Sequence, residues 1–497
     1  MRTLQCVSKL IIIIIQHINC HLNEQNEYSE NTPEIMNKLN SRKVEQNTIY
    51  LPAGTAKVKL SLHPAKLSGC QISFSTLRIA GTFVKTPLMQ PNTAAPREAW
   101  LDWLRIISIA GVLFFHSAMP YVPWWWHIKN AATSNILMEI NDFLHRCRMP
   151  LLFFISGTVS YYMLQKKSGA GFIAIRCRRL LIPLLLAMLV IVPPQVYMER
   201  VSQGYTGNFL QFYARMFSTG AYPKGDLSWH HLWFVAYLLV YDILFAPVFV
   251  WFNSARGKAF LQRHHWLATR RYIYLLMIPG VLIYTILVMK YPATGDLIHD
   301  YAFFPYYLTF VLAGFICIAH PALMDSLERN RRLSFALALL TLIFINYCRW
   351  NDADPWGERY AGQPLNMSFA YSYLAIQAIS GWMWVFMALG YGKRYLNRQH
   401  PVILTYANQA VYPFYILHQT VIVILAYYVV KAPDGVGMKY LFTVGSTFFV
   451  SMSIYHLFIQ PFPVMRFLFG MKPKPREKPV VKESSTPEIA APLPVTA

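Results

Sequence analysis

The sequence predicts an all-α, polytopic integral membrane protein with about ten transmembrane helices. Of its 497 residues, 55% are hydrophobic and 14% are charged, whereas soluble globular chains carry roughly 25% charged residues. From residue 101 onward, apolar runs of about 18 to 22 residues alternate with polar loops, and each run is long enough to cross roughly 30 Å of hydrocarbon as a helix. The distribution of positive charge supports the same fold class.

The expected spans follow one another along the chain as apolar runs that are bounded by polar loops. They cover residues 104–121, 149–164, 180–197, 231–252, 272–289, 301–318, 333–348, 368–389, 411–430 and 440–460.

Lys and Arg gather in the loops after the even-numbered spans and after the tenth. These five stretches hold 5, 5, 3, 3 and 5 basic residues, 21 in all, whereas the alternate loops are richer in Trp, Tyr, Asp and Gly. The positive-inside rule therefore places both ends of the helical domain in the cytoplasm. The formal net charge of +22 is largely this topology signal, and we expect no nucleic-acid partner.

Two segments flank the helical domain, which we expect to cover residues 96–472. Residues 1–95 are expected to be a poorly ordered extension, because the apolar run KLIIIIIQ is too short to span a membrane and lacks a small-residue cleavage site. Met89 begins a short polar segment that leads into the first span. One hypothesis is therefore that the protein starts at Met89 and that the residues before it are a misassigned extension. The tail 473–497 is rich in Pro, Lys, Glu and Ala, which predicts a disordered cytoplasmic tail.

The seven cysteines form no C-x-x-C pair and lie in different segments of the chain. Neither a disulfide framework nor a zinc site is suggested by this spacing. We expect no structural disulfide and no metal.

Two ionisable residues lie in the first span, in the stretch LDWLRIISIAGVLFFHSAMPY. Arg105 and His116 are eleven positions apart, which at about 100° per residue is three full turns plus roughly 20°. Both side chains therefore project from one helix face, about 16 Å apart along the axis, with Arg105 at the cytoplasmic end. Because ionisable groups in a span are costly to bury, they usually face a cavity or a partner.

Each of these residues also has a purely structural explanation. Arg105 can be a boundary arginine that snorkels to the interface and pairs with Asp102, three positions earlier. His116 can be a core histidine that hydrogen-bonds to a hydroxyl or to a backbone carbonyl. The first span by itself leaves these alternatives open.

Five motifs occur in order between residues 97 and 460. They are R-x10-H in the first span, NDFLHRCRMPLLFFISGTVSYY with its F-x-S-G core, RCRRLLIPLL with its R-x-x-R spacing, SWHHLWFVAYLL and YPFYILHQTVI. With the stretch WHIKN at 126–130, this series resembles the membrane acyltransferase-3 family, and it is nearest to the glucan biosynthesis protein C branch of that family.

The resemblance implies an enzyme that transfers an acyl group other than an amino-acyl group. The implied donor is cytoplasmic acyl-coenzyme A (acyl-CoA), a substrate rather than a bound cofactor, and the implied acceptor is a hydroxyl of an extracytoplasmic carbohydrate. The branch favours acetyl or succinyl transfer to a glucan. The expected location is the inner (cytoplasmic) membrane, in contact with the lipid bilayer.

The resemblance and the chemistry of acyl transfer assign roles to four residues. A thioester acyl transfer needs a base for the acceptor hydroxyl, and histidine suits this task near neutral pH. We expect His116 to be that base and Arg105 to be the second catalytic residue. Because guanidinium groups bind phosphate in forked pairs, Arg105, Arg176 and Arg179 are expected to bind acyl-CoA. Alternatively, Arg176 and Arg179 are only positive-inside anchors.

Four further residues are assigned supporting or acceptor-side roles, namely His231, Trp233, His418 and Ser156. His231 lies where a sugar acceptor would enter, although an interfacial histidine beside Trp is also ordinary. His418 can instead hydrogen-bond between helices, and Ser156 with its neighbouring glycine can simply allow close helix approach. The run Trp124–Trp126 is typical of an interfacial aromatic belt, with sugar stacking as the alternative.

A second function class stays open at the level of sequence. In a proton-coupled transporter or flippase of a carbohydrate-linked substrate, Arg105 and His116 would line a translocation path. Transporter folds commonly contain repeated halves, and the sequence shows no internal repeat at a fixed period. This observation favours the acyltransferase.

Overall fold

The computed structural model describes residues 48–50, 57–59, 98–355, 366–397 and 401–473. The chain divides into two compact units, Met1–Thr93 and Ala94–Ala497. In the first unit, the described residues form β1 (Thr48–Tyr50) and β2 (Lys57–Lys59), which pair antiparallel. The predictions of an N-terminal extension and of a disordered tail fall almost entirely outside the described residues and stay predictions.

The described part of the second unit is helical. Its first half contains α2 (Ala99–Ala118), η2 (Met119–Tyr121), α3 (Asn135–Leu164), α4 (Gly169–Arg176), η3 (Cys177–Leu181), α5 (Ile182–Leu186), η4 (Ala187–Ile191), α6 (Val192–Ser202), α7 (Phe209–Met216), η5 (His230–Leu232), α8 (Trp233–Leu244), α9 (Ala246–Asn253) and α10 (Ala255–Arg263). Its second half contains η6 (His265–Ala268), η7 (Tyr272–Met277), α11 (Ile278–Leu287), α12 (Phe303–Ala319), α13 (Pro321–Trp350), α15 (Met367–Tyr395), α16 (Pro401–Val429), α17 (Val436–Ile454), η8 (Tyr455–Ile459) and α18 (Pro463–Leu468).

All ten predicted spans fall on helical segments, which agrees with an all-α membrane protein. Among the described residues, six helices are long and apolar enough to cross a membrane, or seven if the bent pair α8–α9, with its angle of 58°, counts as one span. Two predicted spans lie on shorter apolar helices, Tyr272–Leu287 and Phe303–Ala319. A third lies in α3, which is not among the six. The count of about ten and the cytoplasmic ends therefore stay predictions.

Some of the helices, among them α3 and α7, begin at a side-chain cap. Ser134 precedes α3, and its hydroxyl accepts the backbone N–H of Leu137. Asn208 and Gln211 form a reciprocal capping box at the start of α7. Such side chains satisfy the backbone N–H groups that the first helical turn leaves unpaired.

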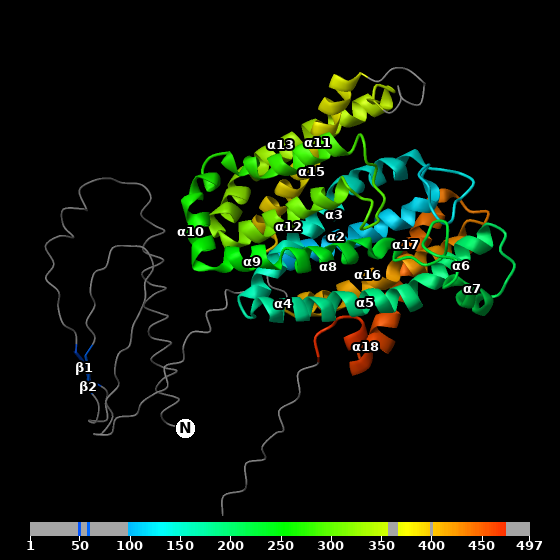
Figure 1. Ribbon diagram of the computed structural model, residues 1–497, viewed down its shortest axis with the longest axis horizontal. Helices are drawn as coiled ribbons and strands as arrows, with labels where there is room; N and C mark the ends of the chain where they lie inside the picture. Colours follow the sequence, from blue (N-terminus) through cyan, green and yellow to red (C-terminus); the bar gives the residue numbers. More distant parts are fainter. Residues whose placement is uncertain (1–47, 51–56, 60–97, 356–365, 398–400, 474–497) are drawn as a thin grey trace, which may run out of the picture. The chain divides into compact units, whose positions relative to one another are not determined.

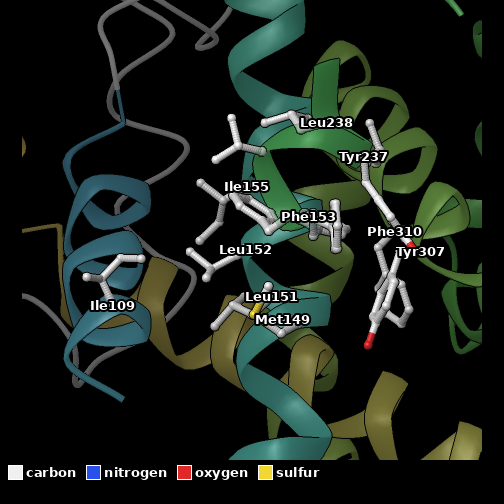
Figure 2. Packing of buried hydrophobic residues seen from close by; sticks show 14 of the residues in the cluster. Ile109, Met149, Leu151, Leu152, Phe153, Ile155, Tyr237, Leu238, Tyr307 and Phe310 are labelled. Atoms are coloured by element: carbon white, nitrogen blue, oxygen red, sulfur yellow. The ribbon is translucent and has the colours of Figure 1, made fainter. Parts of the chain in front are cut away.

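The core of the second unit is built around α3, which packs against α2, α12 and α15. Figure 2 shows Leu152 and Ile155 of α3 directed toward α2, with Phe153 between α3 and α8. The helices α3 and α12 approach very closely, because an added Cβ on Gly157 would lie 2.0 Å from the carbonyl oxygen of Val311. Small residues at such a crossing let two backbones pack directly against each other.

The loops gather at two ends of the helical unit. Figure 1 shows α4 and α10 at one end and α7 at the opposite end. The basic loops 165–179 and 253–271, which the sequence assigns to the cytoplasm, contain α4 and α10. The loop 119–134 and the end of α6 lie at the α7 end (Figure 1), where the candidate site begins.

Candidate active site

The first-span histidine lies against the late-span histidine. Helices α2 and α16 pack side by side, and they run in the same direction because Arg105 pairs with Asn408 and His116 with His418. Nδ1 of His116 lies 2.8 Å from Nε2 of His418, and the two rings stack with centroids 5.1 Å apart. About three turns earlier on each helix, Nη2 of Arg105 donates to the side chain of Asn408 at 2.8 Å and to its carbonyl at 3.1 Å. Packing of α2 on α16 thus positions both predicted catalytic residues.

The hydrogen bonds of this pair determine which ring nitrogen carries the proton. Nδ1 of His418 lies 2.6 Å from the carbonyl oxygen of Tyr415, and a carbonyl can only accept, so this nitrogen is protonated. Nε2 of neutral His418 is then an acceptor, and Nδ1 of His116 donates to it. The free lone pair of His116 is therefore on Nε2. His418 is buried while His116 is partly exposed, so a reactant can reach the nitrogen that is able to accept a proton.

His231 joins this pair from η5. Its ring centroid lies 5.1 Å from that of His418, and its Nε2 donates to the carbonyl of Ile416 at 3.1 Å. The hydroxyl of Tyr415 donates to the carbonyl of His231 at 2.5 Å. Nδ1 of His231 is buried and has no hydrogen-bond partner among the described residues. The three predicted histidines therefore form one cluster between α2, α16 and the start of α8.

Among the described residues, the ring contacts of Trp233 and the hydrogen bond of Ser156 are with residues other than these histidines. Trp233 lies in an aromatic group, with ring centroids 5.2 Å from Tyr237 and 5.5 Å from Tyr307. The hydroxyl of Ser156 donates to the carbonyl of Leu152 in its own helix at 2.8 Å. Neither contact positions a reacting atom, and their supporting roles stay predictions.

The two arginines of the R-x-x-R motif have different surroundings. Arg176 is buried, and its Nε lies 2.6 Å from Oδ2 of Asp242. Ser160 completes this group, because its Oγ accepts from Nη2 of Arg176 at 2.8 Å and donates to Asp242 at 2.9 Å. Arg179 instead lines a pocket of about 110 Å³ with Arg178 and residues of and after α18.

Arg148 is a buried cation that the sequence analysis did not single out. Its guanidinium lies 3.4 Å from the ring centroid of Phe115, the residue next to His116. The residue is 8% exposed, and its Nε and Nη1 have no hydrogen-bond partner among the residues that the structure describes. A buried guanidinium with unused donors is costly. Such donors are suited to a substrate group that is negative or becomes negative during a reaction.

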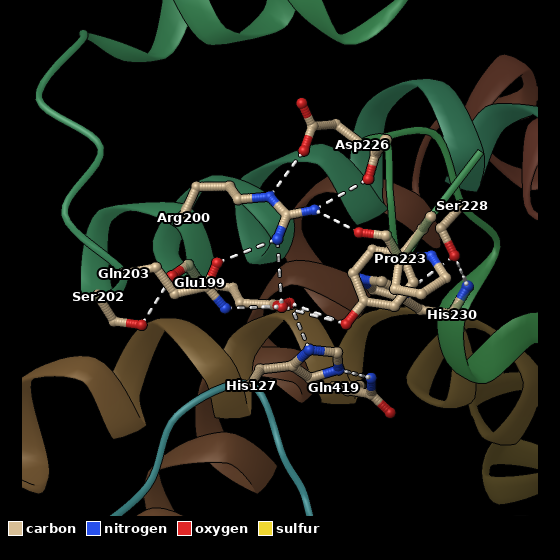
Figure 3. A network of polar contacts seen from close by, with 12 residues as sticks. His127, Glu199, Arg200, Ser202, Gln203, Pro223, Asp226, Ser228, His230 and Gln419 are labelled. Carbon is tan, nitrogen blue, oxygen red and sulfur yellow. Dashed lines mark hydrogen bonds and ion pairs between the residues drawn. The ribbon is translucent and has the colours of Figure 1, made fainter. Parts of the chain in front are cut away.

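A second polar cluster, around His127 and Glu199 (Figure 3), lies next to the histidine cluster, because Trp126 contacts both His116 and His127. Nδ1 of His127 lies 2.6 Å from Oε2 of Glu199, and both side chains are buried. The hydroxyl of Tyr222 donates to Oε1 of Glu199 at 3.1 Å. His230 lies beside His127, with ring centroids 4.7 Å apart. Burial, and then the neighbouring Glu199 carboxylate, raise the pKa of Tyr222, so its hydroxyl stays a donor.

Comparison with known protein families adds an independent observation. The model of a family described as an acyltransferase domain matches residues 98–456.

The chain belongs to the acyltransferase-3 family.

Its curated relatives match most of the chain. Glucans biosynthesis protein C of Salmonella typhimurium (strain LT2) is 24% identical over 408 residues, which are 79% of this chain and 98% of the relative. The protein of that name from Salmonella schwarzengrund is 25% identical over 411 residues, with the same shares covered. No solved structure matches the chain. The protein is therefore a multi-pass membrane acyltransferase that transfers groups other than amino-acyl groups.

One group in the acyltransferase has the donor set of a metal site. Ligand atoms of His127, Glu199 and His230 all lie within 4.8 Å of one another, and two histidines with a glutamate are a donor set that zinc enzymes use. The close contact between His127 and Glu199 is, however, that of a hydrogen bond. The expectation that the protein binds no metal stays a prediction.

Sequence reasoning missed this second cluster for a physical reason. Glu199 follows the third predicted span, and Tyr222 lies in a polar loop, so neither breaks an apolar pattern. His127 had a weak signal in the stretch WHIKN. By contrast, the sequence could have indicated Asp242 as a candidate site residue, because it is an ionisable residue inside the predicted fourth span.

Proposed function

We propose that the protein is an inner-membrane O-acyltransferase that moves an acyl group, acetyl or succinyl, from cytoplasmic acyl-CoA to a hydroxyl of an extracytoplasmic glucan or related glycan. Family membership supports the reaction class, and the printed name of the relatives supports the acceptor class. The observation that carries the proposal is the hydrogen-bonded chain from His116 through His418 to the Tyr415 carbonyl. It presents an unprotonated ring nitrogen at a partly exposed position.

In the proposed reaction, Nε2 of His116 accepts the proton of the acceptor hydroxyl as its oxygen attacks the thioester carbonyl carbon. The tetrahedral intermediate then collapses, the C–S bond breaks, and His116 returns the proton to the coenzyme A sulfur. The products are an ester and free coenzyme A. His418 is a positioning residue, because its Nε2 accepts from Nδ1 of His116 and stabilises the imidazolium that forms.

Arg148 has a proposed role in the same step. The carbonyl oxygen of the thioester becomes an oxyanion in the tetrahedral intermediate, and fixed donors in a dry site stabilise this charge strongly. The unused Nε–H and Nη1–H groups of Arg148 are such donors beside Phe115 and His116. A guanidinium is suited to this task because it keeps its charge when it is buried.

The proposed donor site lies at the opposite end of α2. Arg105 is about three turns from His116, a distance that the pantetheine arm of coenzyme A can bridge. Arg179 supports a phosphate site there because it lines the small pocket beside Arg178. Arg176 is engaged by Asp242 and Ser160, so its proposed contact with acyl-CoA is the least supported of the three.

A reconstituted assay tests this function. Purified protein in liposomes is supplied with radiolabelled acetyl-CoA or succinyl-CoA and a glucan acceptor, and labelled glucan is measured. We expect His116→Ala to lower kcat by about 100- to 10,000-fold, the usual contribution of a general base. We expect His418→Gln to lower kcat by a smaller factor without changing the KM for acyl-CoA.

Two outcomes would contradict the proposal. One is a His116→Ala variant that keeps the wild-type rate. The other is a wild-type protein that consumes no thioester with any acceptor while it moves a carbohydrate across the vesicle membrane. Arg105→Ala should mainly raise the KM for acyl-CoA, and an unchanged KM would remove Arg105 from the donor site.

A further inference from the structure

We propose that His127, Glu199, Tyr222 and His230, with Trp125 at their edge, form the subsite that binds a hydroxyl of the acceptor carbohydrate. We call these five residues the acceptor subsite. The inference rests on the proposed function, because a glycan acceptor must reach His116 from outside the helical core. It joins Glu199 and Tyr222, which lie in none of the motifs, to His127, His230 and Trp125, which lie in stretches that the sequence analysis names.

The base of the acceptor subsite is a histidine that a carboxylate orients. Glu199 accepts from Nδ1 of His127 at 2.6 Å and from the Tyr222 hydroxyl at 3.1 Å. The proton of His127 is thereby held on Nδ1, and its Nε2 is left as an acceptor. Among the described residues, Nε2 has one long contact, 3.4 Å from the amide nitrogen of Gln419. An incoming hydroxyl can therefore donate to this nitrogen.

His230 adds a second group that lacks a partner. Its Nδ1 lies 2.9 Å from Oγ of Ser228, while its Nε2 is buried and has no hydrogen-bond partner among the described residues. The backbone of His230 has a φ of 42°, a left-handed conformation that is costly for a residue other than glycine and is enriched at functional sites. In either tautomer, Nε2 needs a partner, and a carbohydrate hydroxyl can both donate and accept.

Trp125 provides an apolar edge to this polar group. Its side chain is 65% exposed, so the face of its indole ring is open to a ligand. Its ring centroid lies 5.3 Å from His127 and 6.4 Å from Tyr222. Sugar rings have apolar C–H faces and polar edges. An exposed indole beside buried hydrogen-bonding groups matches both parts of such a ligand.

The acceptor subsite adjoins the reacting histidine through two direct neighbours. The ring of Trp126 stacks on His116 with centroids 5.4 Å apart, and it lies 4.7 Å from His127. On α16, Gln419 contacts His127 while the preceding residue, His418, contacts His116. A sugar held at the subsite therefore lies beside the residue proposed to deprotonate it.

The geometry favours a hydrogen-bonded site over a metal site. Ligands that share a zinc ion at bond lengths of about 2.0–2.2 Å in a tetrahedral arrangement lie roughly 3.3 Å apart. The separation of 2.6 Å between His127 and Glu199 is that of a charge-assisted hydrogen bond. A metal would have to displace the Nδ1 proton and separate the pair.

The test uses the full-length protein in detergent and a panel of linear glucose hexamers that differ in linkage. Hexamer binding is measured by tryptophan fluorescence, and acyl transfer from acetyl-CoA and succinyl-CoA is measured by mass spectrometry. We expect Glu199→Gln and Trp125→Ala each to weaken hexamer binding and to raise the hexamer KM by about 3- to 10-fold, the effect of losing one contact. Trp125→Phe should restore binding of the hexamers.

The matched control is His299→Gln. His299 pairs with Asp296 as His127 pairs with Glu199, but both partners are exposed, so this variant should bind hexamers as the wild type does. Failure of the wild type to bind any hexamer, or unchanged hexamer KM values in both subsite variants, would overturn the acceptor subsite. Zinc bound at one equivalent and lost in His230→Gln would also overturn it. Hexamer binding without any turnover of acyl-CoA would instead contradict the proposed function alone.

Discussion

At the scale of single residues, the buried arginines Arg148 and Arg176 have opposite surroundings. They lie in consecutive helices, α3 and α4. Arg176 has a carboxylate and a hydroxyl within hydrogen-bond distance, so its charge is compensated. Arg148 stacks on Phe115 and keeps unused donors. Removing one partner of a compensated buried pair leaves an unpaired charge, whereas removing an uncompensated charge relieves a cost. Stability and activity should therefore respond differently at these two positions.

We expect Arg148→Gln to keep or raise the thermal midpoint of the protein in detergent and to lower kcat by about 100- to 1,000-fold, the effect of losing an oxyanion donor. We expect Arg176→Gln to lower stability by about 3–5 kcal/mol, because Asp242 is left buried without its cation. Thermal unfolding and the acyl-transfer assay measure both quantities. An Arg176 variant of full stability with a raised KM for acyl-CoA would show instead that Arg176 binds the donor.

At the scale of elements, the crossing of α3 and α12 depends on glycine in both helices. An added Cβ on Gly157 would lie 2.0 Å from the Val311 carbonyl oxygen, and one on Gly314 would lie 2.0 Å from that of Phe154. Both distances are far below van der Waals contact. Because backbone atoms cannot rotate away, the helices would have to move apart.

We expect Gly157→Ala to destabilise the protein by about 1–3 kcal/mol or more, the usual cost of overpacking a core. The matched control is Gly445→Ala in α17, where an added Cβ would have no atom within 4 Å and where alanine favours the helix by up to about 1 kcal/mol. Size-exclusion profiles and thermal midpoints of the two variants provide the comparison. Equal stability of the two would contradict the close crossing.

The F-x-S-G motif predicted a close helix approach but could not identify the partner. Glycine in an apolar run indicates that something packs tightly against it. The partner, α12, lies about 150 residues later in the chain, and no local pattern connects the two segments. The partner of Arg176 was unknown for the same reason, because Asp242 and Arg176 meet only when α8 packs against α4.

At the scale of the whole molecule, the basic loops and the two site clusters are separated along the helical unit. The α4 and α10 segments lie at one end, and α6, which carries Glu199 of the acceptor subsite, lies toward the other (Figure 1). With the basic end in the cytoplasm, acyl-CoA would approach Arg105 from inside, and the acceptor would approach His127 from outside. The proposed reaction therefore depends on this orientation.

Cysteine labelling in intact cells tests the orientation. In a background without native cysteines, Lys258→Cys in α10 and Lys224→Cys in the loop after α7 each provide one exposed thiol. We expect a membrane-impermeant maleimide to label the cysteine at position 224 and to label that at 258 only after the cells are permeabilised. The reverse pattern would contradict both the topology and the direction of acyl transfer.

The sequence by itself determined the fold class, the apolar segments and the shared face of Arg105 and His116. These properties depend on local composition and on helical periodicity, which a single segment contains in full. The motifs also determined the family, because their order along the chain needs no knowledge of contacts.

Only the tertiary structure decided which residues meet. It placed His418 on Nδ1 of His116 and thereby fixed the free lone pair on Nε2. It also assembled His127, Glu199, Tyr222 and His230 from a loop, the end of α6 and a second loop. Within the described part of the chain, it left Nε and Nη1 of Arg148 without a hydrogen-bond partner. Hydrogen bonds and buried charges depend on contacts between segments that are distant in sequence, and such contacts exist only after the helices have packed.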